Sequence, residues 1–354
     1  MAGAPRAAER GVEQIYRDLR AKLRDVLPDF ELRLKAEVAH EVLRLKAERR
    51  AVILAHNYME PALYHSVPDF AGDSLELSRR AAATEADVIV FCGVRFMAET
   101  AKILNPSKTV LLPSAKGGCS LAASISGEDV RQLKRRFPGV PVVAYVNTYA
   151  EVKAEADVCC TSGNAAAVVE SLDAERVIFV PDEYLARNVA RETGRRIIVP
   201  SAAGPGGAGA ERGAALVGWP GRCEVHEQFA VEDVDAARRQ FPDVVVLAHP
   251  ECSPEVVAAA DFTGSTSAMI RHVRDSAAGR YLLLTECSMG DNVAAANPGK
   301  ELLRLCSVRC PHMNEITLEE TRDALRFSRY TIEVPEPIRV RAARSIERML
   351  AIGG

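Results

Sequence analysis

Short apolar runs that end in polar residues recur along the chain. The run at 51–58, AVILAHNY, is rich in β-branched residues, and similar runs stand at 142–148 (VVAYVNT) and 244–252 (VVVLAHPEC). Each predicts a buried parallel strand followed by a loop at its carboxyl end. Aligned with one another, the runs place these polar residues at two shared positions: His56, Tyr145 and His249, then Tyr58, Asn147 and Glu251.

The segments that follow the three runs also resemble one another. Each contains an Ala-Asp pair, at Ala86, Ala156 and Ala260, and then a turn of small residues and a helical pattern. A further apolar run follows each time, TVLLPS, VIFVPD or YLLLTE. Strands that alternate with helices in this order predict a parallel sheet covered by helices.

The repetition predicts an α/β fold with three related three-layer α/β/α domains, whose short parallel sheets surround a pseudo-threefold axis. Helical patterns are expected on both flanks, and a Gly/Ala-rich stretch without periodicity is expected to be a mobile insert. The expected parts are an N-terminal helical segment (1–50), three α/β domains (51–139, 140–242 and 243–330, with the insert at 200–215) and a C-terminal helical extension (331–354).

Ligands of open parallel sheets bind outside the carboxyl ends of the strands, where the six aligned polar residues are expected. Small hydroxyl residues follow nearby and resemble helix N-caps, whose free N–H groups favour anions. These hydroxyl residues are Ser74, Ser162, Ser265 and Thr266. Plain caps and anion ligands are both compatible with this pattern.

Each expected domain supplies one cysteine in a loop rich in Gly or Pro, namely Cys119, Cys223 and Cys310. Three thiolates without a fourth suggest an iron–sulfur cluster with one iron free of protein ligands. A zinc site with His226 as the fourth ligand is the chemical alternative. At this point the two kinds of site remain open.

Composition excludes several other classes of function. The net charge of −3 over 354 residues gives no electrostatic footprint for nucleic acid. No apolar run reaches the length of a membrane span, and the N-terminus lacks the apolar core of a signal peptide. We therefore expect a cytoplasmic protein, in which the nine cysteines are buried thiols, metal ligands or catalytic groups rather than disulfides.

Eight motifs, in this order, resemble the quinolinate synthase family, the iron–sulfur enzymes of de novo NAD biosynthesis. They are AHNY, GDSLELSR, GCSLA, AYVNT, WPGRCEVH, AHPEC, GSTSAM and CPHMNEITLE, within a match that extends from Leu34 to Arg326. The resemblance implies a [4Fe-4S] cluster at the junction of three domains. Its protein ligands would be Cys119, Cys223 and Cys310, and His226 would donate a hydrogen bond to Cys223 without binding the cluster itself.

The resemblance also implies the reaction. Iminoaspartate condenses with dihydroxyacetone phosphate to give quinolinate, phosphate and two waters, and a transient contact with L-aspartate oxidase would supply the imine. The substrate-binding residues would be His56, Ser74, Tyr145, Asn147, Ser162, His249, Glu251, Ser265 and Thr266. Glu251 would be the principal base, with His249, Tyr58 and His56 as further acid–base groups.

Two departures and two alternatives accompany the resemblance. The insert before Trp219 is longer than is usual in the family, and Cys306 stands four residues before Cys310 instead of three. A thiol–disulfide role carried over from other members is therefore not expected for Cys306. The alternatives are a zinc-dependent hydrolase or aldolase that uses the same residues, and an iron–sulfur sensor without catalysis.

Overall fold

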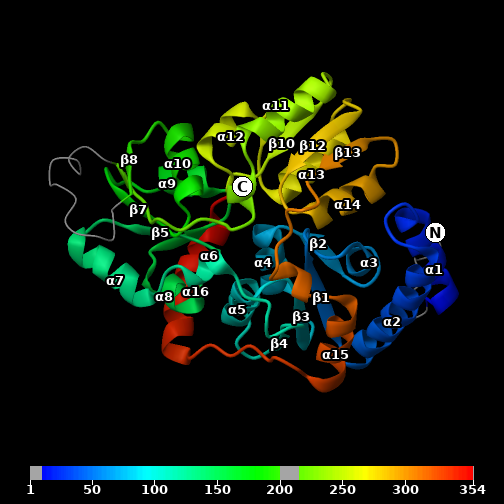
Figure 1. Ribbon diagram of the computed structural model, residues 1–354. Coiled ribbons are helices and arrows are strands. Elements are labelled where there is room, and N and C mark those ends of the chain that lie inside the picture. Colours follow the sequence, from blue (N-terminus) through cyan, green and yellow to red (C-terminus); the bar gives the residue numbers. More distant parts are fainter. Residues whose placement is uncertain (1–9, 200–214, 354) are drawn as a thin grey trace. The chain divides into compact units, whose positions relative to one another are not determined.

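The computed structural model describes residues 10–199 and 215–353. Three short parallel sheets, each flanked by helices, make up these parts of the chain (Figure 1). The prediction of an α/β fold with three such sheets is confirmed. The insert expected at 200–215 lies, apart from Ala215, outside the described residues.

The three sheets share the order of their first three strands, and the second sheet has an additional fifth strand. The first is β2(Phe70–Gly72), β1(Ala51–His56), β3(Val88–Cys92) and β4(Thr109–Leu111). The second is β6(Val158–Cys160), β5(Val142–Tyr145), β7(Val177–Val180), β9(Leu216–Val217) and β8(Ile197–Ile198). The third is β11(Phe262–Thr263), β10(Val245–Ala248), β12(Arg280–Leu284) and β13(Glu301–Arg304). In each sheet the second strand along the chain lies at the edge, beside the first.

Helices connect the strands and extend the chain at both ends. In chain order, with η marking a 3-10 helix, they are α1(Val12–Leu23), α2(Asp29–Glu48), α3(Pro61–Tyr64), α4(Ser74–Ala83), α5(Arg95–Leu104), α6(Ser120–Ala123), α7(Gly127–Arg136), α8(Ala150–Glu155), α9(Ala165–Glu170), α10(Glu183–Glu192), η2(His226–Gln228), α11(Val231–Gln240), α12(Pro254–Ala259), α13(Thr266–Asp275), α14(Cys287–Ala296), η3(Met313–Glu315), α15(Leu318–Phe327) and α16(Glu336–Ala351).

One aspartate marks the repeat in all three sheets. Its backbone N–H donates to a carbonyl of the central strand, and its carboxylate accepts from the N–H of the same residue, at 2.9 and 2.8 Å respectively. The pairs are Asp69 with Ile53, Asp157 with Val142, and Asp261 with Val246. A basic residue of the helix before the central strand approaches each carboxylate: Lys46, Lys134 and Arg238.

This repeat corrects the sequence alignment of the first copy. Asp157 and Asp261 correspond to Asp69, before the short strand β2, and not to Asp87, before β3. The pair at Ala86 was therefore aligned one strand too late. Because β2 has only three residues, two of them exposed, its sequence carries no apolar run. The correction places Ser74, Ser162 and Thr266 after equivalent strands.

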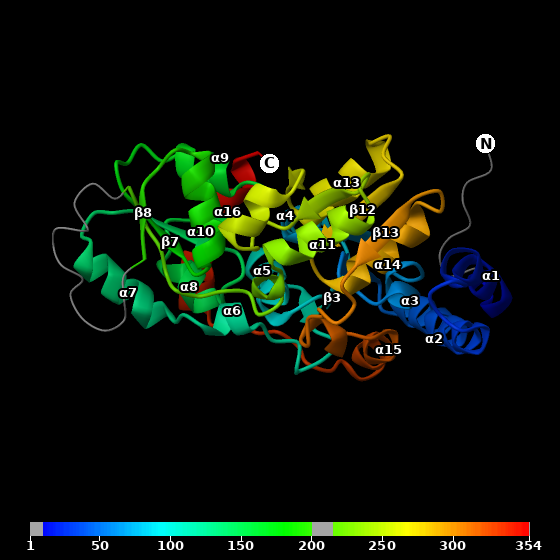
Figure 2. The same ribbon diagram turned by 45° about the horizontal axis from the view of Figure 1, so that its top comes forward.

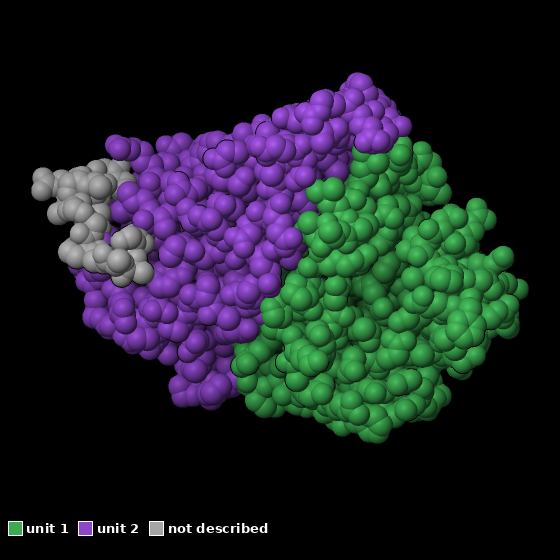
Figure 3. Space-filling model, in the orientation of Figure 1, with its two compact units in different colours: residues 1–118, 286–333 green, residues 119–285, 334–354 purple. Residues whose placement is uncertain are grey.

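The chain divides into two compact units (Figure 3). Unit 1 contains residues 1–118 and 286–333, and unit 2 contains residues 119–285 and 334–354. Within unit 1, α15 packs against α2 and β3. Within unit 2, the C-terminal helix α16 packs against α8 and β6 (Figure 2), and Ser345 of α16 donates to the carbonyl of Lys153 at 2.8 Å.

Candidate active site

Glu251, in the turn after β10, is the centre of a buried polar cluster in unit 2. Nδ2 of Asn147 donates to Glu251 Oε1 at 3.0 Å, and Nδ1 of His226 lies 2.7 Å from Oε2. Tyr145 also hydrogen-bonds to this carboxylate, and Nδ1 of His249 lies 3.5 Å away. Residues at the carboxyl ends of strands from two different sheets, together with His226, therefore converge on one carboxylate.

These contacts decide the charge of Glu251. Burial opposes ionisation, but the charge and hydrogen bond of His226, the charge of His249 and the hydrogen bond from Tyr145 outweigh it. Together they lower the pKa of Glu251 to about 2. The carboxylate is thus ionised at neutral pH and accepts hydrogen bonds through both of its oxygens.

The histidines at the two equivalent strand ends have the same local geometry. Nδ1 of His249 accepts from the backbone N–H of Glu251 at 3.3 Å, and Nδ1 of His56 accepts from that of Tyr58 at 3.2 Å. A ring nitrogen that accepts leaves the proton of a neutral imidazole on Nε2.

His226 connects Glu251 with Cys223. Its Nδ1 lies 3.2 Å from Cys223 Sγ, and its Nε2 lies 3.0 Å from Thr285 Oγ1. Its ring stacks on that of His249, with centroids 4.5 Å apart. Donor atoms of Cys223, His226 and Glu251 all lie within 4.8 Å of one another, a spacing that can hold a metal ion.

The loops that carry Cys119 and Cys223 are joined within unit 2. Ser120 Oγ donates to Glu224 Oε1 at 2.8 Å, and Trp219 Nε1 donates to the carbonyl of Ser124 at 3.2 Å. Burial, then the charges of Glu251 and of Cys119, raise the pKa of the Cys223 thiol, while backbone N–H groups oppose the shift. The two cysteines are therefore close enough to interact electrostatically.

Exposure sorts the seven free cysteines into two groups. Cys92, Cys159, Cys160 and Cys252 are buried free thiols, as the sequence predicts. Burial raises the pKa of Cys92 to about 12, which suits an inert packing role. The three half-buried free thiols are the predicted ligands Cys119, Cys223 and Cys310.

The three half-buried cysteines also share a hydrogen-bonding pattern. Sγ of Cys119 accepts from the N–H of Ala122, and Sγ of Cys310 from that of Met313, both at 3.5 Å. Cys223 interacts in the same way with the N–H of His226. N–H donors stabilise thiolate sulfur and tune iron–sulfur clusters, so this donor set fits a cluster with cysteine ligands.

Cys287 and Cys306 form a disulfide in unit 1. The expectation that all nine cysteines remain thiols or ligands is therefore wrong for this pair. The bond attaches the first residue of α14 to the loop that leads to Cys310. The 19-residue separation of the two cysteines gives no recognisable motif, so the sequence alone did not indicate the pairing.

The remaining predicted residues of unit 1 lie near the carboxyl end of the first sheet. The rings of His56 and Tyr58 meet edge to face, with centroids 4.6 Å apart. Ser74 is the first residue of α4, and the N-cap is Asp73, which accepts from the N–H groups of Leu75 and Glu76. Cys310 also belongs to unit 1, whereas the other predicted site residues belong to unit 2.

Of the three predicted hydroxyl residues in unit 2, only Ser265 is a helix N-cap. Ser265 caps α13 through the N–H of Ala268, so Thr266 is the first residue of that helix and not its cap. The N-cap position of α9 is held by Asn164, and not by Ser162. A Cβ on Gly163 would lie 3.5 Å from Ser265, so the two hydroxyl loops are neighbours.

Asp182 is a buried polar residue that the sequence patterns did not indicate, although it follows strand β7 as the other polar residues follow theirs. Its side chain is fully buried and caps α10 through the N–H of Leu185 at 2.8 Å. Burial and the nearby charge of Glu251 hold the pKa of Asp182 well above its usual value. The polar end of VIFVPD was the signal that could have found it.

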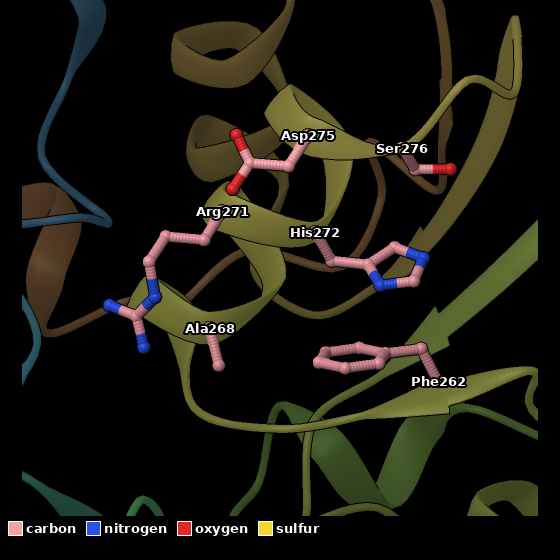
Figure 4. A pocket seen from close by; sticks show the side chains of 6 residues that line it. All are labelled: Phe262, Ala268, Arg271, His272, Asp275 and Ser276. Atoms are coloured by element: carbon pink, nitrogen blue, oxygen red, sulfur yellow. The ribbon is translucent and has the colours of Figure 1, made fainter.

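An open pocket on β11 and α13 is distinct from this cluster (Figure 4). Its lining residues are Phe262, Ala268, Arg271, His272, Asp275 and Ser276, none of which the sequence predicts as a site residue. The rings of Phe262 and His272 stack with centroids 4.3 Å apart. The pocket therefore adds no residue to the candidate site.

Among residues 10–199 and 215–353, no helix combines the length and apolar character needed to span a membrane.

Similarity to known proteins gives further information. The family described as "Quinolinate synthetase A protein" matches residues 40–351.

Similar proteins include Quinolinate synthase 2 of Mesorhizobium japonicum, 52% identical over 94% of this chain and 96% of its own. The Quinolinate synthase of Agrobacterium fabrum is 51% identical over 92% of this chain and 89% of its own. That of Xylella fastidiosa is 52% identical over 88% and 86%. With a family match over most of its length and relatives at this identity, the chain belongs to the quinolinate synthetase A family of enzymes.

Proposed function

We propose that the chain is a quinolinate synthase, which condenses iminoaspartate with dihydroxyacetone phosphate and releases quinolinate, phosphate and two waters. The atoms balance without an oxidant or a reductant. The observation that carries the proposal is the convergence of Tyr145, Asn147, His226 and His249 on Glu251, beside Cys223, in a chain of this family.

Cys119, Cys223 and Cys310 are proposed to hold a [4Fe-4S] cluster. Their partial exposure and their N–H···S interactions support this assignment, because the other six cysteines are buried free thiols or disulfide-bonded. When bound, the cluster supplies a Lewis acid that assists the loss of hydroxyl as water. His226 contacts Cys223 Sγ and is proposed to orient it.

The other predicted residues have proposed roles that follow from the charges of the substrates. Iminoaspartate carries two carboxylates and dihydroxyacetone phosphate carries a phosphate, which hydroxyl groups and helix N-termini can bind. Ser74 and Thr266 begin α4 and α13, and Gly163, the residue after Ser162, lies beside Ser265. The substrate-binding set is completed by His56, Tyr145, Asn147, His249 and Glu251.

Glu251 is proposed as the principal base of the condensation. Its Oε1 and Oε2 atoms are held by Asn147 and His226, so the carboxylate has a fixed position from which to accept a proton. His249 can donate from Nε2, because its Nδ1 accepts a backbone N–H. Tyr58 and His56 are further acid–base candidates in unit 1.

Three expectations from the sequence stay predictions. They are the domain boundaries with their pseudo-threefold arrangement, the cytoplasmic location, and a transient contact with L-aspartate oxidase.

One alternative function keeps a specific observation in its favour. The spacing of Cys223, His226 and Glu251 donor atoms would also suit zinc, as in a hydrolase or aldolase.

An assay of quinolinate formation tests the proposed function. Protein purified without oxygen should convert the two substrates to quinolinate and phosphate in equal amounts, and omission of either substrate should abolish both products. Phosphate release from dihydroxyacetone phosphate alone would instead favour a hydrolase. Cleavage of a sugar phosphate with no quinolinate formed would favour the aldolase.

A further inference from the structure

A buried asparagine of α10 holds the turn that carries Glu251. Nδ2 of Asn188 donates to the carbonyl of Pro250 at 2.9 Å and to that of Cys252 at 3.0 Å. These two residues flank Glu251 directly, and the Asn188 side chain is buried. The backbone is therefore fixed on both sides of the predicted base by one amide group.

A second asparagine makes the same pair of bonds in unit 1. Nδ2 of Asn292, on α14, donates to the carbonyl of Asn57 at 3.2 Å and to that of Met59 at 2.9 Å. These residues flank Tyr58, which stands at the position equivalent to Glu251 in the first sheet. The Asn292 side chain is also buried.

The two asparagines occupy equivalent places in the repeat. Each is the sixth residue of a ten-residue helix that follows the third strand of its sheet, α10 after β7 and α14 after β12. In α5 the sixth residue is Thr100, whose Oγ1 donates to Phe96 of its own helix. The loop of Asn147 has a different contact: the buried Lys153 donates from its ammonium group to the carbonyl of Thr148. The amide contact thus occurs where the flanked residue is a predicted acid–base group.

The chemistry of the contact requires an amide of this length. An asparagine NH₂ group offers two N–H donors from one atom, and both reach a carbonyl. The reversed amide would place Oδ1 against two carbonyl oxygens, which fixes its orientation. Among the described residues, neither Oδ1 atom has a hydrogen-bond partner, so each contact is made at the cost of one buried unpaired acceptor.

We propose that Asn188 and Asn292 are positioning residues of the reaction, which set the backbone, and hence the side chains, of Glu251 and Tyr58. This inference rests on the proposed function, because it assumes that these two side chains act on the substrates. Glu251 needs a fixed backbone, since its carboxylate contacts Asn147 and His226 at once. A displacement of about 1 Å in a reacting group can reduce a rate on the order of 100-fold.

The variants Asn188→Leu and Asn292→Leu remove the donors at similar side-chain volume. Asn105 supplies a matched control in unit 1, because its buried Nδ2 donates to the carbonyls of Ala81 and Ala101 at 2.9 and 3.0 Å, away from any predicted site residue. All three variants should lose comparable stability. Asn188→Leu and Asn292→Leu should lower kcat about 10- to 100-fold, with the cluster retained, and Asn105→Leu should leave kcat within about twofold.

A double-mutant cycle separates positioning from a general structural role. If Asn188 acts only through Glu251, adding Asn188→Leu to Glu251→Gln should cause little further loss of kcat. The same holds for Asn292→Leu added to Tyr58→Phe. Losses that multiply in full would overturn the positioning role. Should Asn188→Leu not fold, Asn188→Ser, which keeps one donor, enters the same cycle.

Backbone hydrogen exchange gives a readout that does not depend on activity. The N–H groups of Glu251 and Cys252 bond to His249 at 3.3 and 2.9 Å, and their exchange should accelerate in Asn188→Leu but not in Asn105→Leu. If exchange accelerates in Asn188→Leu but the wild-type protein makes no quinolinate, the result would support the role of Asn188 in holding the turn and would overturn the proposed function. Unchanged exchange, with kcat within about twofold of wild type, would overturn the inference about Asn188.

Discussion

The carboxylate of Glu251 lies 2.7 Å from Nδ1 of His226, the same nitrogen that lies 3.2 Å from Cys223 Sγ. The sequence associates His226 only with Cys223, because the two stand three residues apart. The structure adds that His226 connects the predicted base with a predicted cluster ligand. A change at any of the three residues should therefore affect the other two.

Glu251→Gln should keep the fold and the metal content but lose most of the turnover. Gln matches Glu in shape and can still accept from Asn147, whereas it cannot take up a proton. General acid–base groups contribute about 10²- to 10⁴-fold to rates, so kcat should fall by that range. Steady-state kinetics with metal analysis check this. Turnover near that of wild type would remove Glu251 from the proton transfers.

Asp182→Asn should stabilise the protein at neutral pH and leave its stability at low pH unchanged. Burial and the charge of Glu251 raise the folded-state pKa of Asp182 well above its usual 3.8. Between these two pKa values the folded protein holds more protons than the unfolded chain, so stability falls as pH rises through the window. Asn is a good N-cap and lacks this titration.

Melting temperatures of wild type and Asp182→Asn across pH check this prediction. Their difference should grow from near zero below about pH 4 to a positive value at neutral pH. A variant that is less stable at every pH would show that the carboxyl group stabilises the fold as such.

Ser265 and Thr266 should respond differently to loss of their hydroxyls. Ser265 caps α13, so Ser265→Ala should lower the free energy of unfolding by about 0.5–2 kcal/mol. Thr266 does not hold the cap position, so Thr266→Val should keep the melting temperature and raise KM about tenfold, as for a lost hydrogen bond to a charged group. An unchanged KM in Thr266→Val would exclude a substrate-binding role.

The Cys287–Cys306 disulfide should contribute measurably to stability. Its cysteines are 19 residues apart, and closing a loop of that length is worth about 3 kcal/mol in the chain-entropy description. Dithiothreitol should therefore lower the melting temperature of wild type but not that of Cys306→Ser. Equal effects of reductant on both proteins would show that the disulfide does not form in solution.

The sequence predicted the parts of the fold and site that depend on local patterns. The central strands, and the polar residues at their carboxyl ends, follow from apolar runs such as 51–58 and 142–148. Strand β2 was missed because three mostly exposed residues give no periodicity. It is held by Asp69, whose bonds to Ile53 depend on tertiary pairing.

Contacts between distant segments could not be predicted in this way. The Cys287–Cys306 bond, the approach of His226 to Glu251 and the bonds of Asn188 each join residues of different elements. None has a spacing that a local motif records. Cap positions were also misplaced, because several small polar residues adjoin each helix start and only the backbone conformation decides which one caps.

Iron and acid-labile sulfide, counted per chain in protein purified without oxygen, test the assignment of Cys119, Cys223 and Cys310 most directly. The proposed ligand set predicts about four iron and four sulfide ions in wild type. Both should be lost in Cys223→Ala and in the equivalent variants of Cys119 and Cys310, and both should be kept in Cys252→Ala, which alters a buried thiol. One zinc without sulfide in wild type, or full iron in Cys223→Ala, would contradict the cluster and its ligands.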